Sequence, residues 1–179
     1  MVKSPPTQET PSLWKCITSS TFILIYLMSF FSLFFVYFMV GSFKNYGELK
    51  IKNDDFLSVV GAVSSVCGGL RFIWSAMVDK VHSYKKVFAV LLVIEIILAF
   101  TIQLIAPYKW PYLIWVSLAV FCEGGIFALV PTIVSMLFGE QAPKVYGICL
   151  TFNGAVALIQ AIVVKLYLTK HNYPVFIYT

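Results

Sequence analysis

The sequence predicts an all-α, multi-pass membrane bundle with five complete transmembrane helices and the start of a sixth. The chain has 179 residues, of which 60% are hydrophobic and only 12% are charged, whereas a soluble domain carries about 25% charged residues. Its mean hydropathy is +0.87. Apolar runs of membrane-spanning length recur between short polar segments. A water-soluble fold of this composition would be covered in apolar patches.

The chain divides into a short polar tail and one helical domain. Residues 1–15 contain three prolines and predict a mobile tail or the end of a linker, ahead of a transmembrane domain over 16–179. The expected helices cover approximately residues 17–43, 56–78, 87–106, 110–138 and 144–168. The apolar segment 173–179 is too short to span and predicts only the beginning of a sixth helix.

The first helix and the segment after it are defined by a change from apolar to polar residues. The apolar run after Lys15 is far longer than the apolar core of a signal peptide. Residues 44–55 are polar and are expected to form a loop. Asp54 or Asp55 is the expected N-cap of the second helix, because an aspartate oxygen can accept the free N–H groups of a first turn.

The second helix carries a row of small residues. Gly61, Ser65 and Gly69 follow one another at four-residue intervals. Small side chains at this spacing share one helix face and let a neighbouring helix approach closely. We therefore expect this face to contact another helix of the bundle.

The remaining helices are bounded by residues that end helices. Pro107 follows the third helix, and Gly139 and Pro143 mark the segment between the fourth and the fifth. Proline lacks the N–H group that a helix interior requires, and glycine readily adopts the conformation that ends a helix.

Three charged residues lie inside the predicted spans, where a charge usually faces a partner or a water-filled path. Arg71 lies eight residues, about 12 Å, before Asp79, and Glu95 lies about 13 Å beyond Lys86 on the next helix. We therefore expect Arg71 and Glu95 at similar depth on adjacent helices. Either they form a structural ion pair, or Arg71 faces a cavity and binds a carboxylate substrate. Glu123 either binds and releases a proton or is a hydrogen-bonded structural acid.

Other function classes find no support in the sequence. The net charge of +5 comes from scattered lysines that form no basic stripe, so nucleic-acid binding is not expected. No nucleophile constellation or phosphate-binding loop is present, so no enzyme activity and no cofactor are expected. The four cysteines have no metal-ligand spacing and are interpreted as buried apolar side chains, and no metal is expected.

The distribution of lysines does not orient the protein in the bilayer. With the N-terminus inside, six lysines flank each side of the membrane. The densest cluster is the charged segment 79–86 between the second and third helices, which favours a cytosolic position for that segment.

Two motifs in order resemble a known family. The run from Gly69 to Lys80, followed by Lys85-Lys86, is similar to the G-R-x-x-x-G-x-x-x-D-[RK] signature and basic loop between the second and third helices of each half of a major facilitator superfamily transporter. The second motif consists of Gly124-Gly125-Ile126-Phe127, Pro131, Phe138-Gly139 and Tyr146-Gly147. It resembles the fourth and fifth helices of the C-terminal half. The chain looks closest to the oxalate/formate antiporter and monocarboxylate transporter branch.

The resemblance implies a fold, a mechanism and roles for individual residues. It implies an alternating-access transporter that binds its substrate near the midplane between two six-helix halves. Arg71 would bind the carboxylate of the substrate. Asp79, with Lys80 beside it, would latch the second helix to the N-terminal end of the fifth in one access state. The partners implied are a small carboxylate, the lipid bilayer, and an N-terminal six-helix half or another membrane subunit.

Departures from the family pattern refine the expected substrate. Asn153 stands where oxalate transporters carry a lysine, so a dicarboxylate would lack its second cation. Cys67 stands where proton-coupled monocarboxylate transporters carry an acid, and Glu123 is a possible substitute. Ser75 replaces a glycine of the signature. The resemblance therefore implies a single-cation site formed by Arg71 with Asn153, better suited to a monocarboxylate.

A second class of function stays open on the sequence alone. The chain supplies five spans and part of a sixth, whereas a facilitator needs twelve. The alternative is therefore a non-transporting membrane protein, either a truncated product or an accessory subunit that packs within a complex.

Overall fold

The computed structural model describes residues 12–170, and all regular secondary structure in this part of the chain is helical. The elements are α1 (Leu13–Ile17), α2 (Ser20–Ile51), α3 (Asp54–Gly69), α4 (Phe72–Val81), α5 (Tyr84–Ile105), α6 (Lys109–Phe138), η1 (Gly139–Gln141), α7 (Ala142–Cys149) and α8 (Thr151–Lys170). The predicted all-α class is confirmed for these residues.

Four helical stretches of the described chain are long and apolar enough to cross a membrane. They are Ser20–Ile51, Asp54–Val81, Tyr84–Ile105 and Lys109–Val163, the last of which takes in α6, α7 and much of α8. In the first three, fewer than a third of the residues in the most apolar window are buried inside the protein. Helices this apolar and this exposed need lipid or another protein chain against their outer faces.

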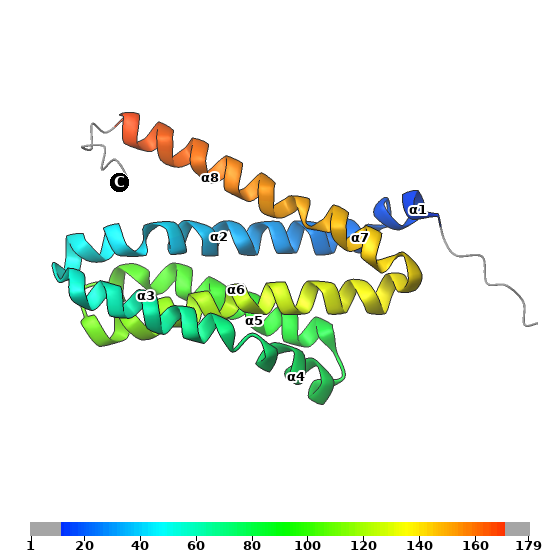
Figure 1. The fold of residues 1–179 in the computed structure, drawn as a ribbon, viewed down its shortest axis with the longest axis horizontal. Helices are drawn as coiled ribbons and strands as arrows, with labels where there is room; N and C mark the ends of the chain where they lie inside the picture. Colours follow the sequence, from blue (N-terminus) through cyan, green and yellow to red (C-terminus); the bar gives the residue numbers. More distant parts are fainter. Residues whose placement is uncertain (1–11, 171–179) are drawn as a thin grey trace, which may run out of the picture.

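The long helices lie side by side, and α6 is central among them (Figure 1). It packs against α2, α3, α4, α5 and α7, while α8 packs mainly on α2. The chain reverses direction at η1, so that α7 and α8 run back along the bundle (Figure 1). We call the end where α4 meets α5 the α4–α5 end. The start of α2 and the end of α6 lie at this end too.

The first helix begins and ends later than the sequence predicted. The expected start at residue 17 falls in α1, and α2 begins at Ser20 after a short break. Ser19 caps α2 by accepting a hydrogen bond from the Phe22 N–H group at 3.2 Å. The predicted tail over 1–15 and the partial helix over 173–179 lie largely or wholly outside the described residues.

The loop predicted over 44–55 was wrong, because most of this segment is helical. α2 continues to Ile51, and only Lys52 and Asn53 join it to α3. Lys52 adopts the left-handed conformation, with φ of 52°, which turns the chain. A helix of 32 residues is about 48 Å long, well beyond a hydrocarbon core roughly 30 Å thick. The polar residues therefore form the last turns of a helix that is longer than a hydrocarbon core is thick.

The predicted cap of α3 was also wrong by one residue. The side chain of Asn53, rather than that of Asp54 or Asp55, accepts the Phe56 N–H group at 3.0 Å. Asp54 instead forms an exposed ion pair with Lys44 of α2, with 2.8 Å between nitrogen and oxygen. Both aspartates still lie in the first turn of α3, where a negative charge complements the helix dipole.

The second and fifth predicted helices are each interrupted. The helix expected over 56–78 is divided into α3 and α4 at Leu70 and Arg71, and the one expected over 144–168 is divided into α7 and α8 at Leu150. Hydropathy does not detect such breaks, because the residues on both sides are apolar.

The charged segment 79–86 is largely helical instead of forming an extended loop. α4 runs to Val81 and α5 begins at Tyr84, so only His82 and Ser83 connect them. His82 adopts the left-handed conformation with φ of 52°. The lysines of this segment therefore stand on the terminal turns of two helices at the α4–α5 end.

α3 packs closely on α6, but through residues other than those of the predicted row, whose Gly61 lies near Phe43 of α2 instead. A Cβ atom at Gly69 would meet nothing within 4 Å. Contact is instead made by Ser64 and Gly68, which directly precede Ser65 and Gly69 of the predicted row. A Cβ atom at Gly124 of α6 would lie 2.7 Å from the Gly68 carbonyl oxygen, and the hydroxyls of Ser64 and Ser117 lie 3.3 Å apart.

We predict that Gly124→Ala destabilises the protein by about 1–3 kcal/mol, because the new methyl group would force the α3 backbone away from α6. The control is Gly147→Ala, where a Cβ atom meets nothing within 4 Å and alanine favours the helix. Thermal unfolding of both purified variants in detergent micelles tests this. Equal unfolding temperatures for the two variants would contradict the close packing of α3 on α6.

Candidate functional site

Arg71 lies at the interruption between α3 and α4, with an exposed side chain. Its Cβ atom faces α6 closely, because a Cβ atom built at Gly124 would lie 3.0 Å from it. The glycine therefore allows the start of α4 to rest directly on α6. The guanidinium group extends from a fixed point of the backbone near the middle of the Asp54–Val81 stretch.

The interruption is a short segment of tighter helix. The Arg71 N–H group donates to the Gly68 carbonyl at 3.3 Å, and the Trp74 N–H group donates to the Arg71 carbonyl at 3.1 Å. These bonds connect residues three apart instead of four, as in a 3₁₀ turn. Such a turn within a long helical stretch marks a place where the helix can bend, and it exposes the backbone dipole of the following half-helix.

The ion pair considered between Arg71 and Glu95 does not form. Glu95 is buried, with 4% of its surface exposed, and it accepts a hydrogen bond from the Ser32 hydroxyl of α2. Its other carboxylate oxygen has no hydrogen-bond partner. The helix rise predicts a height for each residue along its helix, but not the direction of its side chain around the helix axis. Glu95 points toward α2, whereas Arg71 begins against α6 at its Cβ atom and has an exposed side chain.

Asn153 lies one turn beyond the interruption between α7 and α8, where its N–H group donates to the Leu150 carbonyl at 3.0 Å. Its side-chain oxygen accepts a hydrogen bond from the Tyr37 hydroxyl of α2. Gln160, two turns further along α8, donates to the Tyr37 carbonyl at 2.8 Å. These two contacts hold α8 on α2 and leave the amide N–H₂ group of Asn153 free to donate to another molecule.

Glu123 of α6 lies near Tyr37 and precedes the glycine that packs against Arg71, but it forms no ion pair with Arg71. Its half-buried carboxylate lies close enough to the Tyr37 hydroxyl to interact with it electrostatically. The next residue is Gly124, which lies against the Arg71 Cβ atom. Cys122, the residue before Glu123, is buried in the interior. Gly125 faces Leu91 of α5 and the Trp74 ring. Glu123 therefore lies on the side of α6 that turns away from α5.

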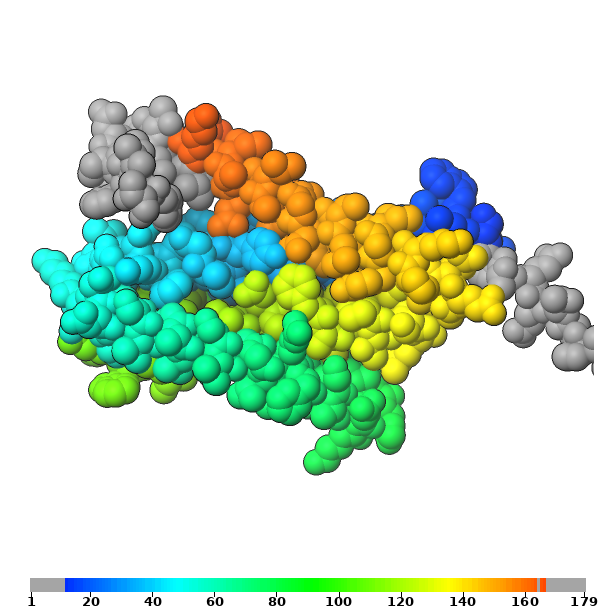
Figure 2. Space-filling model, viewed as in Figure 1, coloured from blue at the N-terminus to red at the C-terminus, as the bar shows by residue number. Residues whose placement is uncertain are grey.

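We call Asn153, Tyr37, Glu123 and Arg71 the polar arc. They come from α8, α2, α6 and the α3–α4 interruption, and each is half-buried or exposed. Figure 2 shows α6 reaching the surface between α2 and α3–α4, with α8 beyond α2. These side chains comprise one cation, one acid, an amide and a phenol hydroxyl; a hydrogen bond joins Tyr37 to Asn153, and Arg71 forms no ion pair with Glu123.

The sequence prediction included three members of the arc and missed Tyr37. A single phenol hydroxyl within an aromatic-rich helix was the available signal, because a polar group at this depth needs a hydrogen-bond partner. Tyr26 on the same helix behaves similarly, since its hydroxyl lies 3.1 Å from that of Thr151 on α8.

Asp79 and Lys80 lie apart from the arc, on the last turns of α4 at the α4–α5 end. Both are exposed and neither forms an ion pair in this structure. Their expected role as a latch therefore stays a prediction about another arrangement of the helices.

The chain matches no protein-family model, no curated protein and no solved structure.

We predict that Ser32→Ala destabilises the protein by about 1–3 kcal/mol, because it leaves both carboxylate oxygens of the buried Glu95 without a partner. The matched control is Ser29→Ala, one turn away on α2. Ser29 is also buried, but its hydroxyl has no hydrogen-bond partner, so its loss should leave stability unchanged or slightly raised. Thermal unfolding in detergent micelles measures both, and a larger loss for Ser29→Ala would refute the role of the Ser32 contact.

Proposed function

We propose that this chain is a multi-pass membrane protein that forms one half of an alternating-access transporter for small monocarboxylates. The fold would be that of the C-terminal half of a major facilitator superfamily transporter. In this proposal α7 and α8 together make the fifth crossing, which the reversal of the chain at η1 supports (Figure 1). The partner would be a second helical half or another membrane subunit.

The observation that carries the proposal is Arg71, an exposed cation without an ion-pair partner at a helix interruption in the middle of an apolar stretch. A charge at this depth is costly unless it faces water, a counter-charge or a ligand. Transporters build their substrate sites at interrupted helices near the midplane, where the ends of half-helices point at charged groups of the substrate. Arg71 and Asn153 both lie at or beside such interruptions.

The composition of the polar arc favours a substrate with one carboxylate. Arg71 is the cation of the arc, and Asn153 and Tyr37 contribute neutral polar groups. A bidentate contact to one carboxylate would use the planar guanidinium, and the amide of Asn153 would contact a second oxygen of a hydroxy- or keto-acid. A second carboxylate would find Glu123 in the arc instead of a cation.

The two acids within the spans differ in suitability for coupling. Glu95 is buried and bonded to Ser32, away from the arc, which fits a structural acid. Glu123 is half-buried and belongs to the arc. We therefore assign Glu123 as the residue whose proton or counter-charge would couple to binding at Arg71.

An accessory, non-transporting subunit is the alternative. The large apolar exposure of the first three stretches supports it, since those faces could pack on another membrane protein. In that case the arc would bond to the partner, and Arg71 would pair with one of the partner's acids instead of a substrate.

We predict that Arg71→Gln lowers uptake of labelled lactate, pyruvate or formate into vesicles by at least about tenfold, because it removes a charge-assisted contact worth about 1.5–3 kcal/mol. The full chain is reconstituted with whatever partner co-purifies, and uptake is measured at two pH values. Lys50→Gln, which removes an exposed lysine at the far end of α2, is the matched control.

Membrane abundance of each variant is measured in parallel, so that a loss of protein is not taken for a loss of binding. Unchanged uptake by Arg71→Gln would refute its role as the carboxylate site. Absence of uptake by the wild-type complex, together with stable co-purification of a partner, would favour the accessory subunit.

A further inference from the structure

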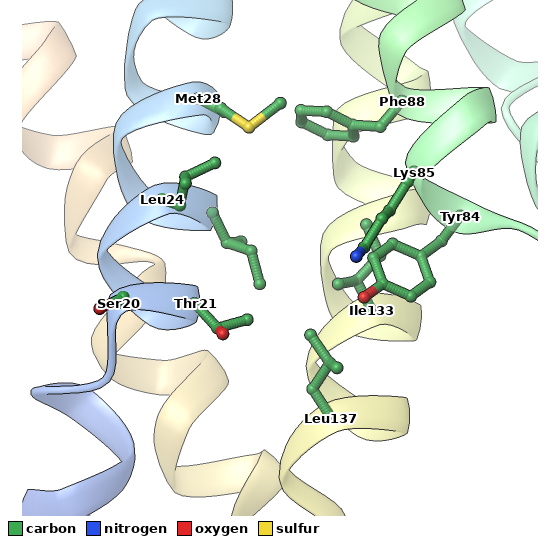
Figure 3. Close-up of a pocket in the computed structure, with 10 residues that line it drawn as sticks. Ser20, Thr21, Leu24, Met28, Tyr84, Lys85, Phe88, Ile133 and Leu137 are labelled. Atoms are coloured by element: carbon green, nitrogen blue, oxygen red, sulfur yellow. The ribbon is translucent and has the colours of Figure 1, made fainter.

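A groove of about 460 Å³ opens between α2 and α5 at the α4–α5 end of the bundle, with α6 behind it (Figure 3). Its lining residues are Ser20, Thr21, Leu24, Ile25, Met28, Tyr84, Lys85, Phe88, Ile133 and Leu137. None of them belongs to the polar arc, and none is acidic. The volume is in the range of small-molecule binding sites, about 300–1,000 Å³.

The deep part of the groove is apolar. Met28 of α2 and Phe88 of α5 point toward one another across its inner end, and Ile133 of α6 lies nearer the mouth, behind Tyr84 (Figure 3). Met28 lies eight residues after Ser20 along the same helix, so the groove extends about 12 Å along the bundle axis. These dimensions suit a flexible hydrocarbon chain that lies parallel to the helices.

The outer part of the groove is polar and carries positive charge. The side chains of Tyr84 and Lys85 point into it from α5, opposite Ser20 and Thr21 of α2 (Figure 3). The two α5 residues and the two α2 residues occupy the first turns of their helices, where the helix dipole favours an anion. The side chain of the α5 cap residue Ser83 makes no capping hydrogen bond.

The positions of these residues match the layers of a bilayer. The polar mouth lies where α2 and α5 begin and α6 ends, which is the headgroup level of helices that span. Leu24, on the wall of the groove, is 57% exposed, so the groove opens sideways toward lipid. A bilayer presents molecules with an anionic head and an apolar chain at this place.

We propose that this groove binds an anionic glycerophospholipid from the leaflet at the α4–α5 end. One acyl chain lies between α2 and α5 as far as Met28 and Phe88. The phosphate group binds the Lys85 ammonium and the hydroxyls of the mouth. Charge complementarity at Lys85 selects an anionic headgroup over a zwitterionic one. This proposal does not depend on transport by the polar arc.

The first test measures headgroup selectivity. The full chain is purified from vesicles of phosphatidylcholine with one-tenth phosphatidylglycerol, and lipids retained by the protein are counted by native mass spectrometry. We expect the wild-type protein to retain phosphatidylglycerol in preference to phosphatidylcholine. In the Lys85→Gln variant this preference should be about fivefold weaker. The neighbouring Lys86→Gln removes the same charge outside the groove and should keep the preference. Equal losses from the two variants would overturn the assignment of Lys85.

The second test blocks the apolar part of the groove. Leu24→Trp fills the space between α2 and α5, and should abolish retention of both lipids at this site. Leu27→Trp places the same side chain on an exposed position of α2 that does not line the groove. Unfolding temperatures in lipid-free micelles check that both variants are folded. Retention by Leu24→Trp equal to that of Leu27→Trp would overturn the proposal.

The third test identifies the occupant directly. A photocrosslinking phenylalanine analogue is incorporated at position 24, and the protein is irradiated in the same vesicles. A mass increase equal to one phosphatidylglycerol, weaker when Lys85→Gln is combined with it, supports the proposal. An adduct with a peptide, whether from this chain, a second copy or another protein, would show that a helix occupies the groove and would overturn the lipid assignment.

Discussion

The contact of two adjacent glycines on α6 with its neighbours determines much of this structure. Gly124 faces the Gly68 carbonyl and the Arg71 Cβ atom, and Gly125 faces the Trp74 ring and Leu91. A side chain at either position would push a neighbouring helix away. The pair therefore brings α3 and α4 onto one side of α6 and α5 onto the next. Because the Gly68 carbonyl also accepts the Arg71 N–H group, the same contact fixes where α3 ends and where Arg71 projects.

Polar groups within this apolar bundle are accommodated in two different ways. Glu95 is enclosed, and the Ser32 hydroxyl takes one of its oxygens, so its surroundings do not change unless α2 and α5 separate. Glu123 of α6 and Tyr37 of α2 are only half-buried. An acid held by a fixed hydroxyl stabilises one packing arrangement, whereas an acid at an open surface can respond to a ligand or a partner.

The sequence predicted the helical class, which follows from its hydropathy and is confirmed for the described residues. It did not predict the direction of each side chain around its helix axis. For this reason the Arg71–Glu95 pair was wrong, and the small-residue face was assigned to Gly61, Ser65 and Gly69 instead of Ser64 and Gly68. Those alternatives differ by one residue, or about 100° of rotation. Only packing against α6 distinguishes them.

The positions of several helix ends were predicted wrongly for a related reason. Polar composition identified 44–55 as the boundary of the apolar layer, yet a helix can continue past that boundary because its backbone hydrogen bonds are internal. Hydropathy does not reveal the interruptions at Arg71 and Leu150 either. At these places hydrogen bonds between residues three apart occur in place of bonds between residues four apart, and the apolar composition does not change. Interruptions are therefore visible only from the backbone, although they lie beside the residues that the motifs identified as functional.

The lipid groove and the polar arc lie on opposite sides of α2. Tyr37 follows Met28 by nine residues, which is two and a half turns, so their side chains point in opposite directions. Because α2 is one continuous helix between them, a tilt that changes the arc also changes the distance between α2 and α5 at the groove. A lipid bound between α2 and α5 would favour the arrangement in which the two helices are far enough apart to hold its acyl chain. It would shift the population of arc conformations by no more than its difference in affinity between them.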